Sequence, residues 1–420
     1  MRVLLLIGLP LALLALTGDQ GPPPPLPPLP VDGTLNQLAS IQIVGNVPFD
    51  NQVMAAKALG FRRVRLAARW GDIERPRGRF TWRPFDDRIA ALTRAGITPI
   101  IVIFGGNGGY PGLMSEGEVL TGYARFAGAV AKRYGTGTPE RAILYEIWNE
   151  PNTKTFWRVP PDPESYATMA GAACAAIRQE RPDARVLALG MEGTPVKRPY
   201  FVPAYGIDIY QQWAARAATP ALMACADGFS MHPYLPTPEQ VLRDDPALRA
   251  FMAAHWRKQT PPIVAHTEIG YAIDPRKQVS GEDQAALDLR ALLIGTGLGR
   301  VTNLYQSVDT GRDPAKPDGA YGLVTYDGRV KPAGAAVQRL LRLIGDHRIG
   351  GVEALPGDLY RFSAARGADR AVVLWSTAPR RAKVTAGAAV IDLVSGAPVS
   401  VAPDATVPVG PNPVLATWSQ

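Results

Sequence analysis

The chain has 420 residues, which is too long for one small domain and fits a barrel-sized domain with a smaller one attached. Hydrophobic residues make up 46% of the sequence, enough for a large globular core. The formal net charge is +8, but no basic run or nucleic-acid-binding module accompanies it, so we exclude nucleic acid as a partner. The basicity could favour an anionic glycan, although a solvated arginine-rich surface explains it more simply.

The N-terminus has the pattern of an export signal. Met1 and Arg2 precede an apolar run from Val3 to Leu16, which is short for a membrane-spanning helix. We therefore expect residues 1–20 to be a signal peptide or an N-terminal anchor. Export to the periplasm or the cell exterior follows, with possible membrane tethering. Residues 21–35 are rich in proline and predict a stiff, extended linker.

Apolar runs bounded by Gly, Pro or Asn recur along residues 36–347 and predict strands. In chain order we expect strands within residues 41–44, 61–70, 100–104, 142–148, 185–190, 228–234, 262–271 and 301–308. Helices are expected at residues 51–59, 164–179 and 336–343. The alternation of strands with helices is typical of an α/β fold.

The fourth of these runs ends in a pattern that carries chemistry. An apolar strand leads into Trp148, Asn149 and Glu150, and Pro151 then ends it because proline cannot donate to a strand ladder. The carboxyl group of Glu150 would then lie at the rim of the sheet beside an indole and an amide, which suits carbohydrate chemistry. The alternative is that Glu150 only caps a loop.

The sequence Trp148-Asn149-Glu150-Pro151 resembles the acid/base motif of clan A, the retaining glycoside hydrolases built on (β/α)₈ barrels. In that clan a second carboxylate follows three strands later, at about 120 residues for βα units of ordinary barrel length. The run at residues 262–271 supplies Glu268, which lies 118 residues after Glu150. The pair is far more specific than either motif alone.

The resemblance implies a (β/α)₈ TIM barrel over residues 36–347. The loop at residues 70–86 and the closing segment at residues 321–343 look like those of glycoside hydrolase family 39, the type that includes bacterial exopolysaccharide hydrolases. It further implies retaining hydrolysis, with Glu268 as nucleophile and Glu150 as acid/base, and no cofactor or metal.

The resemblance also implies several substrate-binding or positioning residues. Arg65 matches the arginine that lies beside the nucleophile, with Arg63 and Arg69 as competitors, since a buried arginine is costly unless it meets a carboxylate. Asn149 would bond the sugar 2-hydroxyl. His232 and Tyr234 would face Glu268 and hold it by hydrogen bonds.

Other candidates are aromatic. Trp70 would stack on a sugar ring or anchor its loop in the core, and Tyr271 would lie near the rim. Tyr305 stands on the eighth strand, where clan members often have a Trp.

Glu192 is an alternative catalytic carboxylate, but no motif surrounds it. The glycine-rich residues 105–109 replace a His found in many clan members, which leaves the sugar contacts there open.

Residues 348–420 show a different sequence pattern from the segment expected to form the barrel. Short β-prone runs at residues 359–362, 371–375, 388–393 and 416–418 predict a small antiparallel β-sandwich.

Cys174 and Cys225 lack the spacing of a zinc site. They could form a disulfide in an exported protein, but we favour two buried thiols.

Taken as a whole, the sequence predicts a monomeric, endo-acting hydrolase of a bacterial exopolysaccharide. An exo-acting β-xylosidase-like enzyme is the alternative in the same class. An inactive glycan-binding envelope protein, or a scaffold that docks through its proline segment, are alternatives from other classes.

Overall fold

The computed structural model describes residues 31–138, 141–157, 160–196, 208–313, 316 and 319–419. The expected signal segment, residues 1–20, and residues 21–30 of the proline-rich linker lie outside the described residues. Within those that are described, no helix combines the length and the hydropathy needed to cross a membrane.

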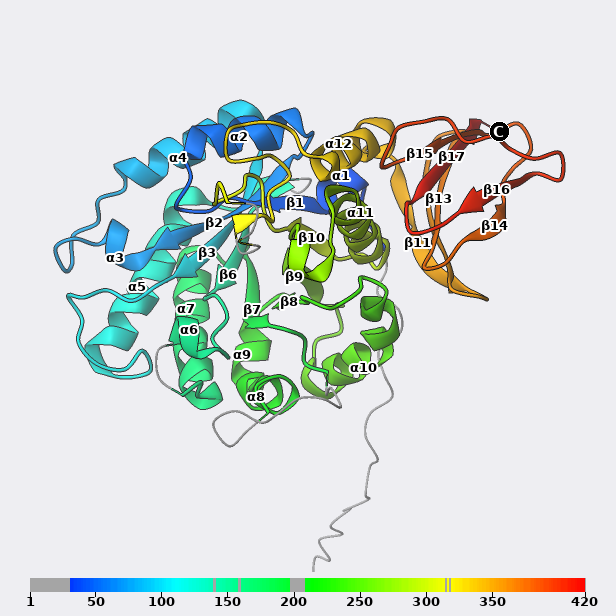
Figure 1. The fold of residues 1–420 in the computed structure, drawn as a ribbon. Coiled ribbons are helices and arrows are strands. Elements are labelled where there is room, and N and C mark those ends of the chain that lie inside the picture. Colours follow the sequence, from blue (N-terminus) through cyan, green and yellow to red (C-terminus); the bar gives the residue numbers. More distant parts are fainter. Residues whose placement is uncertain are drawn as a thin grey trace, which may run out of the picture.

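Eight parallel strands close into a barrel, in the order β1-β2-β3-β6-β7-β8-β9-β10 and back to β1 (Figure 1). The strands are β1 Ala39–Gln42, β2 Arg63–Arg69, β3 Thr98–Phe104, β6 Leu144–Ile147, β7 Arg185–Glu192, β8 Gly228–His232, β9 Ile263–Ile269 and β10 Val301–Leu304. The barrel fold expected from the resemblance is confirmed.

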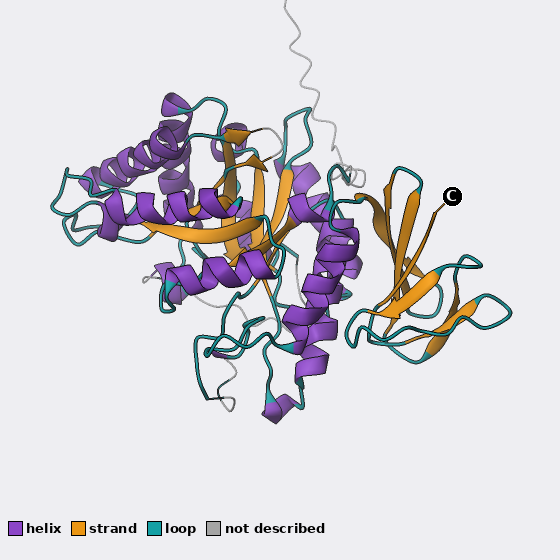
Figure 2. Ribbon diagram, turned by 90° about the horizontal axis from the view of Figure 1, so that it is seen from above, coloured by secondary structure: helices purple, strands orange, loops and turns teal. Residues whose placement is uncertain are grey.

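Helices follow the strands and surround the barrel (Figures 1 and 2). The longer ones are α2 Phe49–Ala58, α4 Arg83–Ala95, α5 Gly117–Tyr134, α7 Pro163–Glu180, α8 Gln211–Ala217, α9 Pro220–Cys225, α10 Gln240–His255, α11 Gly281–Gly297 and α12 Pro332–Ile344. Short elements complete this part, namely α1 Leu35–Leu38, α3 Trp70–Ile73, α6 Lys154–Trp157, the 3₁₀ helix Pro275–Lys277, β4 Gly137–Thr138 and β5 Arg141–Ala142.

Sequence signals set where these elements begin and end. Asp162 caps α7 by accepting a hydrogen bond from the backbone of Glu164, with a proline at the first helical position. Ser280 and Asp283 form a capping box that starts α11. Gly96 ends α4 in the left-handed conformation, with φ of 73°, which glycine adopts without steric cost.

The barrel interior changes character along its axis. Apolar side chains contributed by five strands fill one layer and form a core cluster of their own: Ile100, Leu144, Leu187, Ala265 and Val301. Further toward the carboxyl ends of the strands, the buried side chains are polar or charged, including Gln42, Arg65, Glu146 and Asn303. The apolar layer closes the barrel, and the polar layer lies beneath the face where barrel enzymes place their active sites.

The C-terminal part is a second, all-β body beside α11 and α12 (Figure 1). A five-stranded antiparallel sheet consists of β11 Arg348–Leu355, β12 Leu359–Arg366, β13 Asp369–Ser376, β17 Val414–Ser419 and β15 Ala389–Asp392. A two-stranded sheet pairs β14 Arg380–Lys383 with β16 Thr406–Val409. Buried residues of both sheets, such as Leu374, Val390 and Val407, form one apolar cluster, as expected of a small sandwich.

Polar contacts fix this body to the barrel. The indole Nε1 of Trp375 donates to Glu239 Oε1 at 2.9 Å, and Arg290 lies 3.3 Å from the same oxygen. All three side chains are buried. Because a buried carboxylate is costly unless it is paired, this contact favours one fixed orientation of the sandwich.

The strand ends differ from the predicted ones at functionally important places. β6 stops at Ile147 rather than after Glu150, β8 stops at His232 before Pro233, and β10 stops at Leu304. β1 lies two residues earlier than expected because α1 leads directly into it. The catalytic candidates therefore stand on loops just beyond the barrel more often than the sequence indicated.

The preference for two free thiols was wrong. Cys174 on α7 and Cys225 at the end of α9 form a disulfide, with their Cα atoms 6.2 Å apart. The helices α7 and α9 pack against each other, and this tertiary contact, which the spacing of the two cysteines did not reveal, brings the sulfur atoms together.

Reducing this disulfide should lower the free energy of unfolding. The cysteines are 51 residues apart, and the chain-entropy relation for such a loop gives about 4 kcal/mol, the upper end of the typical range for a disulfide. We expect the guanidinium chloride midpoint to fall when the protein is reduced, and the Cys174→Ala, Cys225→Ala double variant to match the reduced protein. Equal midpoints with and without reductant would contradict the disulfide's contribution.

Candidate active site

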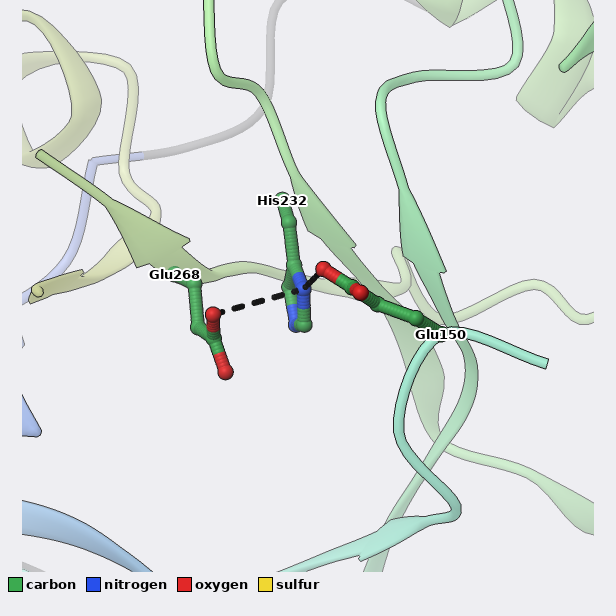
Figure 3. A group of neighbouring side chains, drawn as sticks. All are labelled: Glu150, His232 and Glu268. Atoms are coloured by element: carbon green, nitrogen blue, oxygen red, sulfur yellow. Dashed lines mark hydrogen bonds and ion pairs between the residues drawn. The ribbon is translucent and has the colours of Figure 1, made fainter. Parts of the chain in front are cut away.

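Glu150, His232 and Glu268 converge at the carboxyl end of the barrel (Figure 3). Glu150 lies just beyond β6, His232 is the last residue of β8, and Glu268 lies near the end of β9. One oxygen of each carboxyl group and one nitrogen of the imidazole all lie within 4.8 Å of one another. The two glutamates that the clan A resemblance paired therefore meet in space.

A strained backbone presents Glu150 to this site. Trp148 and Glu150 have φ values of 70° and 45°, in the left-handed region that costs a non-glycine residue about 1–3 kcal/mol. Hydrogen bonds hold this conformation, because Trp148 N donates to Ile103 O at 3.0 Å and Glu150 N donates to Gly190 O at 2.7 Å. The ring of Trp148 is buried and packs edge to face against Phe104, which further restricts the turn.

Gly190 must be a glycine for this turn to form. Its own φ is 50°, and a Cβ there would lie 2.8 Å from the carbonyl oxygen of Trp148. The close approach of β7 to the loop after β6 thus depends on the missing side chain. In this way a residue far from Glu150 in sequence sets the direction of its carboxyl group.

Arg65 is the centre of the charged cluster. Its guanidinium is buried and donates to Glu146 Oε2 at 2.6 Å, to Asn149 Oδ1 at 2.7 Å and to Glu268 Oε1. Burial alone would lower the pKa of Arg65, but the charges of Glu146 and Glu268 raise it above its ordinary value. Of the three arginines considered from sequence, Arg65 is the one that contacts Glu268.

Glu146 was missed by the sequence reasoning. It is fully buried on β6 and accepts a hydrogen bond from Thr267 Oγ1 at 2.6 Å as well as the one from Arg65. Burial would raise its pKa, yet the charge of Arg65 and the neighbouring His232 lower it to about 2. A signal existed, because a carboxylate inside the apolar run from Leu144 to Ile147 requires a buried cation, just as Arg65 requires an anion.

His232 stands between the two predicted catalytic carboxyl groups (Figure 3). Its Nδ1 lies 2.8 Å from Glu150 Oε1 and 3.8 Å from Glu268 Oε2, and its Nε2 lies 3.9 Å from Glu146 Oε1. The expected hydrogen bond to Glu268 is therefore corrected to one with Glu150. The reason is local, since the bond from Glu150 N to Gly190 O carries that carboxyl group toward β7 and its neighbour β8.

The surrounding carboxylates favour a charged His232. Burial alone would lower its pKa, but Glu268, Glu146 and Glu150 together raise it to about 9. A protonated imidazole can donate to Glu150 through Nδ1 while its charge also faces Glu146 and Glu268. The site therefore contains two cations, Arg65 and His232, among three carboxyl groups.

Tyr234 contacts Glu268, whereas Asn149 and Tyr305 lie in the cleft where a substrate could meet them. The hydroxyl of Tyr234 donates to Glu268 Oε2 at 3.1 Å, as the resemblance implied. Asn149 and Tyr305 line a cleft of about 910 Å³ together with Arg65 and Glu268. Tyr305 also contacts Tyr234 edge to face, so one aromatic side of the site is built from two loops.

Other predicted residues lie elsewhere. Trp70 is fully buried, packs on Tyr110 and donates its Nε1 proton to Glu74 at 2.6 Å, so it anchors its loop and cannot stack on a sugar. The hydroxyl of Tyr271 donates to the backbone oxygen of Leu235 and does not line the cleft. The physical reason in both cases is the same, since each polar atom has a protein partner that turns it away from the cleft.

Three further residues were considered as alternatives, Arg63 and Arg69 to Arg65, and Glu192 to the two catalytic glutamates. Arg63 is the first residue of β2 and donates to Ala142 O at 2.9 Å, at the opposite end of the barrel. Arg69 ends the same strand, is exposed and lines the cleft. Glu192 accepts a hydrogen bond from Tyr210 at 3.2 Å, and does not line the cleft.

The group Glu150, His232 and Glu268 is also compact enough to ligate a cation. The fit is poor, because the guanidinium of Arg65 touches Glu268 and would repel a metal ion at that position. An imidazole with a raised pKa is likewise a weak metal ligand, since only its neutral form offers a lone pair.

The fold and a sequence family both match known glycosidases. Residues 39–266 match the model of the cellulase family, glycosyl hydrolase family 5. No curated protein sequence matches the chain. The family model and the structural neighbours agree with the clan A, family 39-like resemblance.

Among solved structures, a family 39 glycoside hydrolase from the gut symbiont Bacteroides cellulosilyticus WH2 shares 19% identity, with a TM-score of 0.71 over 91% of this chain and 81% of that one. A family 39 β-xylosidase from Caulobacter crescentus shares 19% identity, with a TM-score of 0.63 over 92% and 97% of the two chains. A family 30 endoxylanase from Clostridium papyrosolvens C71 shares 14% identity, with a TM-score of 0.59 over 91% and 95%. At these identities the likeness shows the fold.

The raised pKa of His232 has a consequence for stability. A group whose pKa rises on folding, here from 6.5 to about 9, stabilises the protein fully below its unfolded value and loses that contribution as pH rises through 9. Between about pH 7 and pH 10 the wild type should therefore lose more unfolding free energy than a His232→Gln variant.

His255→Gln is the matched control for this comparison. His255 lies on α10 away from the site and burial lowers its pKa, so its change of charge falls mainly below this pH range. Its removal should leave the alkaline slope of the wild type unchanged. A His232→Gln variant with the same slope as the wild type would show that the imidazole is uncharged.

Proposed function

Because the chain belongs to the cellulase family, glycosyl hydrolase family 5, and is therefore a glycoside hydrolase, we propose that it cleaves β-glycosidic bonds with retention of configuration. The observation that carries this proposal is the approach of the carboxyl oxygens of Glu150 and Glu268 to within 4.8 Å. Retaining enzymes hold their two carboxyl groups about 5–5.5 Å apart, whereas inverting enzymes need about 6.5–9.5 Å to admit a water molecule.

In the first half-reaction Glu268 is the nucleophile. One of its oxygens forms a bond to the anomeric carbon while the bond from that carbon to the leaving oxygen breaks. Glu150 gives its proton to the leaving oxygen, so the departing sugar leaves as an alcohol. The contacts from Arg65 and Tyr234 direct an oxygen of Glu268 into the cleft and hold the carboxylate still.

The second half-reaction releases the sugar. Water attacks the anomeric carbon, Glu150 takes a proton from that water, and the ester bond to Glu268 breaks, which restores both groups. We assign the acid/base role to Glu150 because Arg65 contacts Glu146 and Glu268 but not Glu150. Glu268, which that guanidinium holds, is the carboxylate that attacks.

The remaining residues of the site position Glu150 and Glu268 or contact the substrate. Glu146 holds Arg65 in place, so it is a positioning residue rather than one that touches substrate. His232 orients Glu150 by the 2.8 Å hydrogen bond. Asn149 is fixed by Arg65 and lines the cleft, where its amide can donate to a sugar hydroxyl such as the 2-hydroxyl.

A polysaccharide cleaved within the chain is the substrate we favour, in particular a bacterial exopolysaccharide. The cleft volume of about 910 Å³ supports this, because it lies near the top of the roughly 300–1,000 Å³ range of small-molecule sites and has room for more than one sugar. The alternative is exo-acting removal of single sugars, which the likeness to a β-xylosidase fold favours.

We also propose that the protein works outside the cytoplasm, in the periplasm or the cell exterior. The disulfide between Cys174 and Cys225 supports this location, because disulfides persist in oxidising compartments. The apolar run from Val3 to Leu16 is the segment that would direct export or provide an anchor.

Substitutions at the two carboxylates should have different signatures. Glu268→Gln should lower kcat by more than about 10⁴-fold on every substrate, because no covalent intermediate can form. Glu150→Ala should lower kcat by about 10²–10⁴-fold on poor leaving groups but far less in the first step with a dinitrophenyl leaving group, which needs no acid. Azide should restore turnover of Glu150→Ala by replacing the activated water.

Glu192→Gln provides the comparison, since Glu192 is also a carboxylate at a strand end but accepts a hydrogen bond from Tyr210, whereas Glu268 is held by Arg65 and Tyr234. It should keep near-wild-type activity on aryl β-glycosides and on polymer. Near-wild-type turnover by Glu268→Gln would refute the mechanism. The mode of action is read by incubating the wild type with bacterial exopolysaccharides and plant β-glycans. Release of fragments of several sugars would establish endo action, and release of single sugars would establish exo action. Binding without any product would identify a glycan-binding protein.

A further inference from the structure

Two arginines other than Arg65 line the cleft that contains Glu268. Arg69 is the last residue of β2, and Arg88 lies on α4. Both side chains are exposed to solvent within the wall of the cleft, and neither takes part in the mechanism above. The cleft therefore presents positive charge that the hydrolysis of a neutral glycan does not require.

Aromatic rings hold both guanidinium groups. Arg69 lies over the ring of Phe104 at 5.4 Å from its centroid, and Arg88 lies over the ring of Phe49 at 5.5 Å. Phe104 and Phe49 also line the cleft. Stacking on a ring restricts a long side chain without using any of its hydrogen-bond donors, so both groups remain available to a ligand.

No carboxylate within the described part of the chain pairs with either guanidinium. Among the described residues, neither Arg69 nor Arg88 forms an ion pair, although other exposed arginines do, such as Arg133 with Asp86. Asp72 is the acidic residue of the cleft besides Glu268, and it lies 3.5 Å from Arg75, which is not part of the lining. Glu268 is itself in contact with Arg65. Among the residues that the structure describes, the charges of Arg69 and Arg88 thus have no direct ion-pair partner.

We propose that the cleft binds an acidic glycan, and that Arg69 and Arg88 bind carboxylate groups carried by its sugars. This inference rests on the proposed function, because it assigns the substrate class of the same cleft. A guanidinium presents two parallel N–H donors that match the two oxygens of a carboxylate, whereas a neutral sugar offers only hydroxyl groups. The preference is for uronic acid units over the corresponding neutral hexoses.

The test is a binding measurement with matched oligosaccharides. The hydrolytically inactive Glu268→Gln protein is titrated by calorimetry with β-1,4-linked glucose hexamer and with the glucuronate hexamer of the same linkage. The same comparison is made for the β-1,4-linked mannose and mannuronate hexamers. Within each pair the ring and the linkage are constant, and only the C6 hydroxymethyl group is replaced by a carboxylate.

In at least one pair the acidic hexamer should bind more tightly by about tenfold or more, the factor for one added charge-assisted contact. Adding Arg69→Gln and Arg88→Gln should abolish that difference without weakening binding of the neutral hexamer. Arg94→Gln is the control, because it removes the same charge from an exposed position of α4 that does not line the cleft, and it should preserve the difference.

Acidic hexamers that bind no more tightly than the neutral ones in either pair would overturn the proposal. So would a preference that survives in the Arg69→Gln, Arg88→Gln protein, or one that Arg94→Gln removes equally, which would indicate general attraction to a basic surface. These results are independent of the mechanism, because binding is read in a protein that cannot turn over. Failure of the mechanism would appear instead as Glu268-independent hydrolysis of aryl glycosides.

Discussion

The site depends on one buried guanidinium. Arg65 contacts Glu146 on the floor of the site, Asn149 on the loop after β6 and Glu268 on β9, so a single side chain connects elements that are far apart in sequence. An arginine at this depth is stable only while its carboxylates are present, and they are stable only while it is present. The positions of the loop after β6 and of the end of β9 are therefore tied to a charge balance inside the barrel.

His232 extends that balance to Glu150. The imidazole lies among three carboxyl groups, which raise its pKa to about 9, and its hydrogen bond fixes the carboxyl group that we propose as the proton donor. Backbone strain at Trp148 and Glu150 serves the same end, since the left-handed turn is held by β7 through Gly190. Glu150 and Glu268 can thus take different roles because Arg65 contacts Glu268 and not Glu150.

Much of this was predictable from the sequence, and the exceptions have a common cause. Apolar runs placed all eight strands, and the resemblance to clan A, together with the 118-residue spacing, paired Glu150 with Glu268, because both depend on order along the chain. The partner of His232, the burial of Trp70 and the disulfide of Cys174 depend instead on which neighbouring element a side chain meets. Glu146 was the avoidable omission, since a carboxylate in a buried strand always requires a partner.

The central claim is that Glu268 forms a covalent bond to the sugar while Glu150 supplies and removes the proton. The most direct measurement is to incubate the protein with activated 2-deoxy-2-fluoro-β-glycosides, which slow release of the intermediate, and to locate the added mass in proteolytic peptides. We predict one sugar per chain, attached to Glu268. A sugar attached to Glu146 or Glu150 instead, or a first product of inverted anomeric configuration from an aryl glycoside, would contradict the mechanism.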